Sequence, residues 1–86
     1  MNAESSLYEK VCIILSRELG VERNTITANS LIVEELGADS LDMAEISMVI
    51  KDEFGYDLKN EEVFKIKKVH DLVVVLSQKE HILENS

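Results

Sequence analysis

Apolar residues recur at helical spacing near the start of this chain. The stretch opens with Ser6-Leu7-Tyr8-Glu9, which has the form of a capping box at a helix N-terminus. It closes at Gly20, a residue that readily ends a helix because it adopts left-handed backbone angles. Residues three or four positions apart form one apolar side: Leu7, Val11, Ile14, Leu15 and Leu19. The pattern predicts a first amphipathic helix that contributes to the core.

A second apolar series predicts a helix between Asp39 and Gly55. Asp39 suits the N-cap because its carboxylate can accept a backbone N–H, and Gly55 suits the C-terminal stop. One side of this helix is expected to face the core: Met43, Ile46, Ile50 and Phe54. The core therefore receives a second amphipathic helix from the middle of the chain.

The other side of the second helix mixes apolar and acidic residues. Periodicity alone leaves two interpretations equally open, scattered exposed hydrophobes or a docking surface for a partner. The residues on this side alternate at helical spacing: Leu41, Asp42, Ala44, Glu45, Met48 and Asp52.

Two further helices are predicted in the last third of the chain. Asn60 is expected to cap a short third helix, in which Glu61 and Glu62 favour the first turn. The apolar contacts of this short helix are expected from Val63, Phe64 and Ile66. A fourth helix follows from the spacing of Val69, Leu72, Val73 and Leu76.

The sequence leaves two questions about the fourth helix: whether part of it is a strand, and where it ends. The run Val73-Val74-Val75 also suits a β-strand, because β-branched side chains are common in strands, but the neighbouring pattern favours a helix. Beyond Gln78 the sequence allows the helix either to continue through Ile82 and Leu83 or to fray.

Residues 21–38 form a long connection between the first two helices. A connection of this length in a small domain is usually functional. Its apolar residues predict that it packs over the core, with a short helical turn near Glu34 to Leu36. These apolar residues are Ile26, Leu31, Ile32, Val33 and Leu36.

Composition narrows the fold and the class of partner. With 86 residues, we expect one domain over residues 1–86. Proline is absent, glycine occurs three times and no apolar run reaches membrane-spanning length, so the expected fold is all-α. Seventeen acidic against nine basic residues give a net charge of −8, which disfavours nucleic acid and anionic lipid as partners and favours basic protein surfaces.

Cys12 is the only cysteine and cannot form an internal disulfide, which agrees with a reducing compartment. Met1 to Tyr8 lack the pattern of a secretion signal. We therefore expect a cytoplasmic protein, and we also expect it to be a monomer. Cys12 itself lies between Val11 and Ile13 and is expected to be a small buried hydrophobe without a function of its own.

Ser40 lies between Asp39 and Leu41-Asp42 at the predicted start of the second helix. A helix start offers free backbone N–H groups and the positive end of the helix dipole, so it would stabilise a phosphodiester attached to this serine. No base adjoins the hydroxyl, and the flanking carboxylates would repel an attacking anion. Ser40 is therefore predicted to be modified and not catalytic.

The segment Leu36-Gly37-Ala38-Asp39-Ser40-Leu41-Asp42 resembles the modification motif of acyl carrier proteins. The similarity extends over nearly the whole chain. It includes Leu19-Gly20-Val21 at the end of the first helix, Asn29 to Glu35 in the loop, Asp52-Glu53-Phe54 and Glu61-Glu62 followed by Lys65-Ile66.

This resemblance implies a small antiparallel four-helix bundle with 4′-phosphopantetheine covalently attached to Ser40. A separate phosphopantetheinyl transferase would install the group from coenzyme A, next to Asp39 and Leu41. The chain would perform no chemistry itself. Its arm would carry growing acyl chains as thioesters to acyl-synthesis and acyl-transfer enzymes, and an acyl chain could fold back between the helices.

By the same resemblance, the second helix docks on basic patches of those enzymes, so the mixed side becomes more plausible as a docking surface. The expected pathway is fatty-acid synthesis, and a polyketide, lipid-modification or other secondary acyl pathway is the alternative. Lys51, Lys59 and Lys67-Lys68 depart from the family pattern and bear on partner choice. The residues implied in docking are Leu41, Asp42, Ala44, Glu45, Met48, Asp52 and Glu53.

Two other functional classes fit less well. A calcium-binding or adaptor protein is also small, acidic and helical, but neither Asp52 nor Asp57 begins an EF-hand loop, and no metal site is expected. An esterase would need a base for Ser40, and none adjoins it. A triad of Ser40, His70 and Asp71 would arise only by accident, because the chain lacks the G-x-S-x-G motif that presents a nucleophilic serine.

The remaining candidate residues favour ordinary structural roles. His70 and His81 lack metal-ligand spacing and are expected on the surface. Phe54, Tyr56 and Phe64 are expected in core or hinge packing and not in a ligand site.

Overall fold

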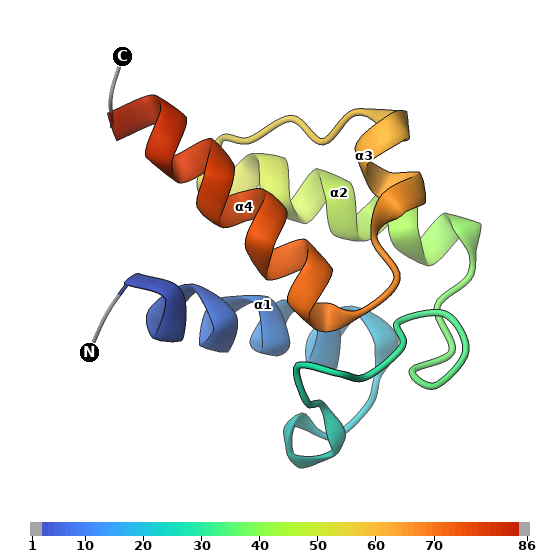
Figure 1. Ribbon diagram of the computed structural model, residues 1–86. Helices are drawn as coiled ribbons and strands as arrows, with labels where there is room; N and C mark the ends of the chain where they lie inside the picture. The colour runs from blue at the N-terminus through green and yellow to red at the C-terminus, as the bar shows by residue number, and fades with distance from the viewer. Residues whose placement is uncertain (1–2, 85–86) are drawn as a thin grey trace.

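The computed structural model describes the backbone of residues 3–84 and the side chains of residues 6–79. Within this part the chain is helical and holds no strand, only an isolated bridge between Leu31 and Lys68. The all-α four-helix arrangement expected from the sequence is confirmed (Figure 1). The elements are α1 (Ala3–Leu19), the 3₁₀ turn η1 (Arg23–Thr25), α2 (Ser40–Phe54), α3 (Asn60–Lys65) and α4 (Val69–Glu84).

The core lies where α1 packs against both α2 and α4. The short α3 lies beside the first half of α2 and close to the start of α4 (Figure 1). The largest side chains that are fully buried come from all three long helices and from the loop: Val11, Leu15, Ile32, Ile46, Ile50, Val69, Leu72 and Leu76. The apolar faces predicted for these helices are therefore the faces that build the core.

The loop between α1 and α2 is tied to the residues that lead into α4. Backbone N–H groups of Ile32, Val69 and His70 donate to the carbonyl oxygens of Lys67, Ser30 and Ala28, at 2.9, 3.0 and 2.9 Å. The buried Ser30 hydroxyl also accepts the Thr27 N–H at 3.0 Å. The long connection is thus an ordered part of the fold, as its apolar residues predict.

Arg23 fastens η1 to α1. Its Nε and Nη2 donate to the two carboxylate oxygens of Glu9, both at 2.8 Å, and its guanidinium carbon lies 5.6 Å from the centre of the Tyr8 ring. The hydrogen bonds from Arg23 lower the pKa of the Glu9 carboxyl. Cys12, one turn along α1, is completely buried, and this burial raises the pKa of its thiol.

Helix ends differ in part from the prediction. α1 begins at Ala3, so Ser6 lies inside the helix and the predicted capping box there is wrong. Asn60 is the first residue of α3 and not its cap; the N–H of the preceding Lys59 donates to Glu62 Oε1 at 3.0 Å. That bond is the main reason why the pKa of the Glu62 carboxyl is lowered, and a 3.1 Å ion pair with Lys79 adds to it.

The predicted end of α2 is confirmed. Gly55 follows Phe54 with φ of 76°, a left-handed conformation that favours glycine, and its N–H donates to Lys51 O at 2.9 Å. Phe54 and Tyr56, half-buried on either side of Gly55, stack with ring centres 5.9 Å apart. Their predicted packing role agrees with this arrangement.

Two residues predicted in the core are exposed. Val33 is 49% exposed, because residues 31–37 form a turn that directs Leu36 inward and leaves Val33 outside. The N–H groups of Glu35 and Gly37 donate to Leu31 O and Val33 O, four positions back as in an α-helix. The short helical turn predicted near Glu34 to Leu36 is therefore present, although the regular helical element of the connection is η1. Phe64 is 77% exposed, whereas Val63, which is partly buried, and Ile66, which is buried just after α3, pack against the core.

α4 is a helix over the Val73-Val74-Val75 run and continues to Glu84, as the first of the two alternatives for the tail predicted. The side chains of His81, Ile82 and Leu83 lie outside the described residues, whereas His70 is exposed as expected. Among the helices described over residues 3–84, none combines the length and apolar character needed to cross a membrane.

Candidate functional site

Ser40 is the first residue of α2, and its side chain is exposed. Asp39 is the N-cap, as predicted, and it exchanges two bonds with Asp42. The Asp42 N–H donates to Asp39 Oδ1 at 2.9 Å, and the Asp39 N–H donates to Asp42 Oδ2 at 3.0 Å. This reciprocal pair fixes the helix start on which Ser40 lies.

The chain reaches this cap through Gly37, whose φ is 79°. The Gly37 N–H donates to Val33 O and the Ala38 N–H donates to Ile32 O, both at 3.1 Å. Ala38 is buried while Asp39 and Ser40 are exposed. The serine is therefore held outward on a turn whose base belongs to the core.

The hydroxyl of Ser40 makes no hydrogen bond to any described residue. The N–H groups of Ser40 and Leu41 lie in the first turn of α2, where a helix provides no carbonyl for them. They and the helix dipole suit the anionic oxygens of a phosphodiester on Ser40. The carboxylates of Asp39 and Asp42 accept each other's backbone N–H and leave those of Ser40 and Leu41 available. The residues present therefore fit a phosphopantetheine group.

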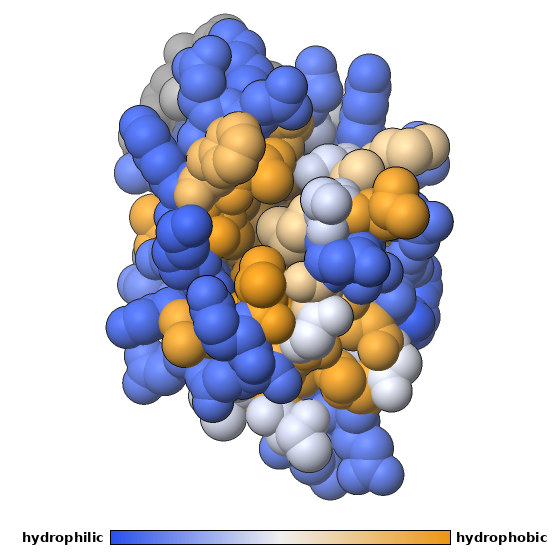
Figure 2. Space-filling model, turned by 90° about the vertical axis from the view of Figure 1, so that its right-hand side faces the viewer, coloured by the Kyte–Doolittle hydropathy of each residue, from blue (hydrophilic) through white to orange (hydrophobic). Residues whose placement is uncertain are grey.

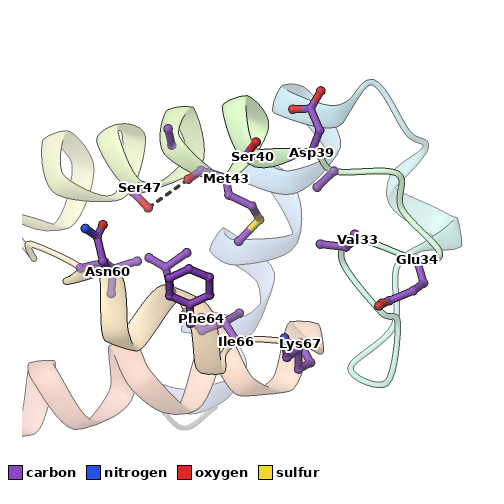
Figure 3. A pocket seen from close by; sticks show the side chains of 14 residues that line it. Val33, Glu34, Asp39, Ser40, Met43, Ser47, Asn60, Phe64, Ile66 and Lys67 are labelled. Atoms are coloured by element: carbon purple, nitrogen blue, oxygen red, sulfur yellow. Dashed lines mark hydrogen bonds between the residues drawn. The ribbon is translucent and has the colours of Figure 1, made fainter.

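A groove of about 740 Å³ runs from Ser40 between α2 and α3. Figure 3 shows Asp39 and Ser40 at one end, Ser47 and Asn60 at the other, and the Met43 side chain pointing from α2 towards α3. The Ser47 hydroxyl donates to Met43 O at 3.0 Å. The lining residues are Val33, Glu34, Ala38, Asp39, Ser40, Met43, Ala44, Ser47, Leu58, Asn60, Val63, Phe64, Ile66 and Lys67.

The mixed side of α2 is exposed beside this groove. Leu41 is 76% and Met48 66% exposed, which is high for large apolar side chains. Asp42 is half-buried, and its carboxylate accepts the Asp39 N–H in the capping box. The other residues of the predicted docking surface are all exposed: Ala44, Glu45, Asp52 and Glu53. Figure 2 shows apolar side chains gathered around a hollow, with hydrophilic residues on both sides.

A hydrolytic arrangement around Ser40 finds no support. The Asp71 carboxylate accepts the backbone N–H groups of Lys67 and Lys68, at 3.0 and 2.9 Å, and thereby caps α4. These bonds, first that of Lys68, lower the pKa of the Asp71 carboxyl. Among the described residues, no three His, Cys, Asp or Glu side chains form a group that could hold a metal ion.

Phe64 and Lys67 line the groove, although the sequence predicted core or hinge packing for Phe64 and marked Lys67 only as a departure from the family pattern. The signal for Phe64 lies in its neighbours. Val63, directly before it in α3, packs against the core, and successive residues of a helix point about 100° apart, so Phe64 faces away from the side that Val63 buries.

Comparison with known proteins identifies the family. The family described as "Phosphopantetheine attachment site" matches residues 9–76. An acyl carrier protein of Akkermansia muciniphila is 37% identical over 76 residues, which cover 88% of this chain and 95% of that protein. An acyl carrier protein of Nitratidesulfovibrio vulgaris strain DP4 is 39% identical over 75 residues, which cover 87% and 99%.

A solved structure described as an acyl carrier protein of Mycobacterium tuberculosis superposes with a TM-score of 0.77 at 30% identity. The match covers 83% of this chain and 95% of that one. Sequence, fold and the setting of Ser40 thus agree, and the chain belongs to the acyl carrier proteins, the non-catalytic carriers of phosphopantetheine.

Proposed function

We propose that Ser40 carries the phosphopantetheine arm and that the chain delivers growing acyl chains to the enzymes of fatty-acid synthesis. The observation that carries the proposal is the exposed Ser40 hydroxyl, free of hydrogen bonds, at the capped start of α2 and at the mouth of an apolar groove. When bound, the arm supplies a thiol that holds the acyl group as a thioester.

The residues around Ser40 position the arm. The first-turn N–H groups of Ser40 and Leu41 are free to hold the phosphodiester oxygens. The bonds between Asp39 and Asp42 keep this turn helical, so the anchoring point stays fixed while the arm moves. Nothing in this role requires a base or a nucleophile, because acyl transfer occurs on the partner enzymes.

The direct test is to incubate the folded chain with coenzyme A and a phosphopantetheinyl transferase and to measure the intact mass. We expect one added group, and fragmentation should locate it on Ser40. A folded chain that stays unlabelled, or is labelled elsewhere, contradicts the proposal. The intact mass of the protein purified from its native cell then identifies the attached acyl group. Fatty-acyl intermediates support fatty-acid synthesis, and other acyl groups support a specialised pathway.

Glu45→Lys is expected to slow acyl transfer by a partner enzyme, on the order of tenfold at low salt, while the fold survives. Glu45 is exposed on α2 between Leu41 and Met48, so the reversed charge would repel a basic patch on the enzyme. The measurement is kcat/KM at two salt concentrations, because salt screens such attraction. Glu22→Lys, the same change on the exposed connection before η1, is the control. Equal rates for wild type and Glu45→Lys at low salt would argue against α2 as the docking surface.

Loading the arm with a medium-length saturated chain is expected to raise the melting temperature. The groove beside Ser40 is lined mostly by apolar side chains, so a chain folded into it would lose contact with water. Each kcal/mol gained raises Tm by about 4–8 °C for a domain of this size. The control is an acetylated arm, which has the same thioester and little to bury. Equal Tm values and equal amide-exchange protection for the two loaded forms would show that the chain stays outside.

We further propose that residues 1–86 act as one carrier domain, as a monomer in the cytoplasm. The described helices share one core, which supports a single domain. The only cysteine, Cys12, is buried and forms no disulfide, which agrees with the reducing cytoplasm. Sedimentation equilibrium should give the molar mass of one chain at all protein concentrations. A molar mass that rises with concentration would contradict the monomer.

A further inference from the structure

The residues between α3 and α4 form a basic corner on a strongly acidic chain. Lys65, Lys67 and Lys68 are exposed, and with Phe64 they make up what we call the α3 corner. The whole chain has a net charge of −8, so three lysines within four positions are a local reversal of sign. Phe64 and Lys67 line the groove that starts at Ser40, which places the corner across that groove from α2.

Lys65 and Lys67 of the α3 corner form no ion pair with a described carboxylate. Glu34 lines the same groove as Lys67, but no ion pair joins them, and Glu62 pairs with Lys79 instead. The Asp71 carboxylate accepts backbone N–H groups of the corner and not its ammonium groups. Exposed lysines without ion-pair partners gain little from folding, so the fold does not account for Lys65 and Lys67. Lys68 differs, because its charge helps to lower the pKa of the Asp71 carboxyl.

Phe64 gives the α3 corner an apolar centre. Its side chain is 77% exposed, the largest exposed fraction among the large apolar side chains that the structure describes. In Figure 3 its ring lies at the groove, between Asn60 and Lys67. A large exposed aromatic ring beside positive charges is the composition that concentrates binding energy in protein interfaces, where aromatic anchors fill pockets on the partner.

We propose that the α3 corner is a second docking surface, which binds an acidic patch around an apolar pocket on an acyl-transfer enzyme. The proposal rests on the proposed function, because the partner is an enzyme that acts on the arm at Ser40. α2 and the α3 corner then carry opposite charge: Glu45 and Asp52 are exposed on α2, and the lysines are exposed on the corner. A partner with the complementary pair of patches would be fixed in one orientation, with its entrance over Ser40.

Reversing the charge of the α3 corner distinguishes this proposal from docking through α2 alone, because the two models predict opposite changes in the association rate. If the partner surface were basic throughout, replacing corner lysines by glutamate would strengthen attraction and raise the association rate. If an acidic patch faces the corner, the same replacement lowers the rate. We therefore choose Lys65→Glu/Lys67→Glu and leave Lys68 in place, because the charge of Lys68 contributes to the lowered pKa of Asp71 at the α4 cap.

The experiment uses the wild-type and variant chains loaded with phosphopantetheine and an acyl group, and a purified acyl-transfer enzyme of the source cell that accepts the wild type. We expect kcat/KM of the double variant to fall roughly tenfold at low salt and less at high salt. Phe64→Ala is expected to lower kcat/KM at both salt concentrations, with Tm unchanged because the ring is exposed. The matched control is Lys10→Glu/Arg17→Glu, which makes the same charge change at two exposed positions on α1.

An unchanged or increased kcat/KM of the double variant overturns the proposal, and so does an equal decrease in the α1 control. Intact mass before the kinetics shows whether each chain has taken up the arm. A wild-type chain that takes up none contradicts the proposed function, and the proposal falls with it. If the chains are loaded but the variant reacts at the wild-type rate, only the docking role of the α3 corner is contradicted, and the proposed function stands.

Discussion

A Ser40→Ala variant is expected to take up no phosphopantetheine from coenzyme A, whereas a Ser47→Ala variant is expected to be loaded as completely as the wild-type chain. Both serines line the groove along α2, so the pair tests position and not merely the presence of a hydroxyl. Ser40 lies at the capped helix start with a free hydroxyl, and Ser47 lies two turns further and donates to Met43 O. The measurement is intact mass after incubation with a transferase.

The loss in Ser40→Ala can be assigned to the missing hydroxyl, because the fold should not change. The N-cap is Asp39, and the Ser40 side chain makes no hydrogen bond to the described residues, so alanine removes no stabilising contact. Circular dichroism and Tm of the variant should match those of the wild type. A Ser40→Ala chain that is still labelled would place the arm elsewhere and remove the basis of the proposed function.

Ile50→Ala is expected to lower the free energy of unfolding by roughly 2–5 kcal/mol. Ile50 is completely buried on α2, in the core that this helix shares with α1 and α4. Removing most of its side chain leaves a cavity that the close-packed neighbours fill only in part. Because small domains have only about 5–15 kcal/mol of total stability, the variant should be close to unfolding at physiological temperature. Urea titration followed by circular dichroism gives the free energy.

Met48→Ala provides the comparison on the same helix. Met48 is 66% exposed, so its truncation should change the free energy of unfolding by about 0.5 kcal/mol or less. The two variants lose side chains of similar size from opposite sides of α2. If Ile50→Ala kept the urea midpoint of the wild type, Ile50 would not belong to the core.

Much of the fold could be predicted from the sequence because the long helices carry regular signals. α2 is the clearest case: Asp39 caps it, Gly55 ends it, and Ile46 and Ile50 face the core as their spacing predicts. The setting of Ser40 could be predicted for the same reason, since a helix start is fixed by residues within one turn. A helix end without such a cap carries a weaker local signal: the capping box at Ser6 predicts the wrong start for α1, which begins at Ala3.

The groove could not be predicted, because it depends on how α2, α3 and the loop come together. Val33 and Phe64 have the apolar character of core residues, and their spacing does not reveal that a turn and a six-residue helix leave them outside. The bonds from the loop to Lys67 O and to the start of α4 join segments more than thirty positions apart in the sequence. Contacts of this kind are set by tertiary packing, which local propensity does not record.

Because Cys12 is buried, thiol labelling can measure the fraction of molecules whose arm carries no acyl group. Cys12 on α1 is completely buried in the core. This burial raises the pKa of the thiol, so little reactive thiolate is present at neutral pH. The sulfhydryl at the tip of an unloaded arm is solvated and reacts freely. A maleimide dye applied to the native protein therefore reports the fraction of molecules with an empty arm, and the polypeptide itself adds almost no background.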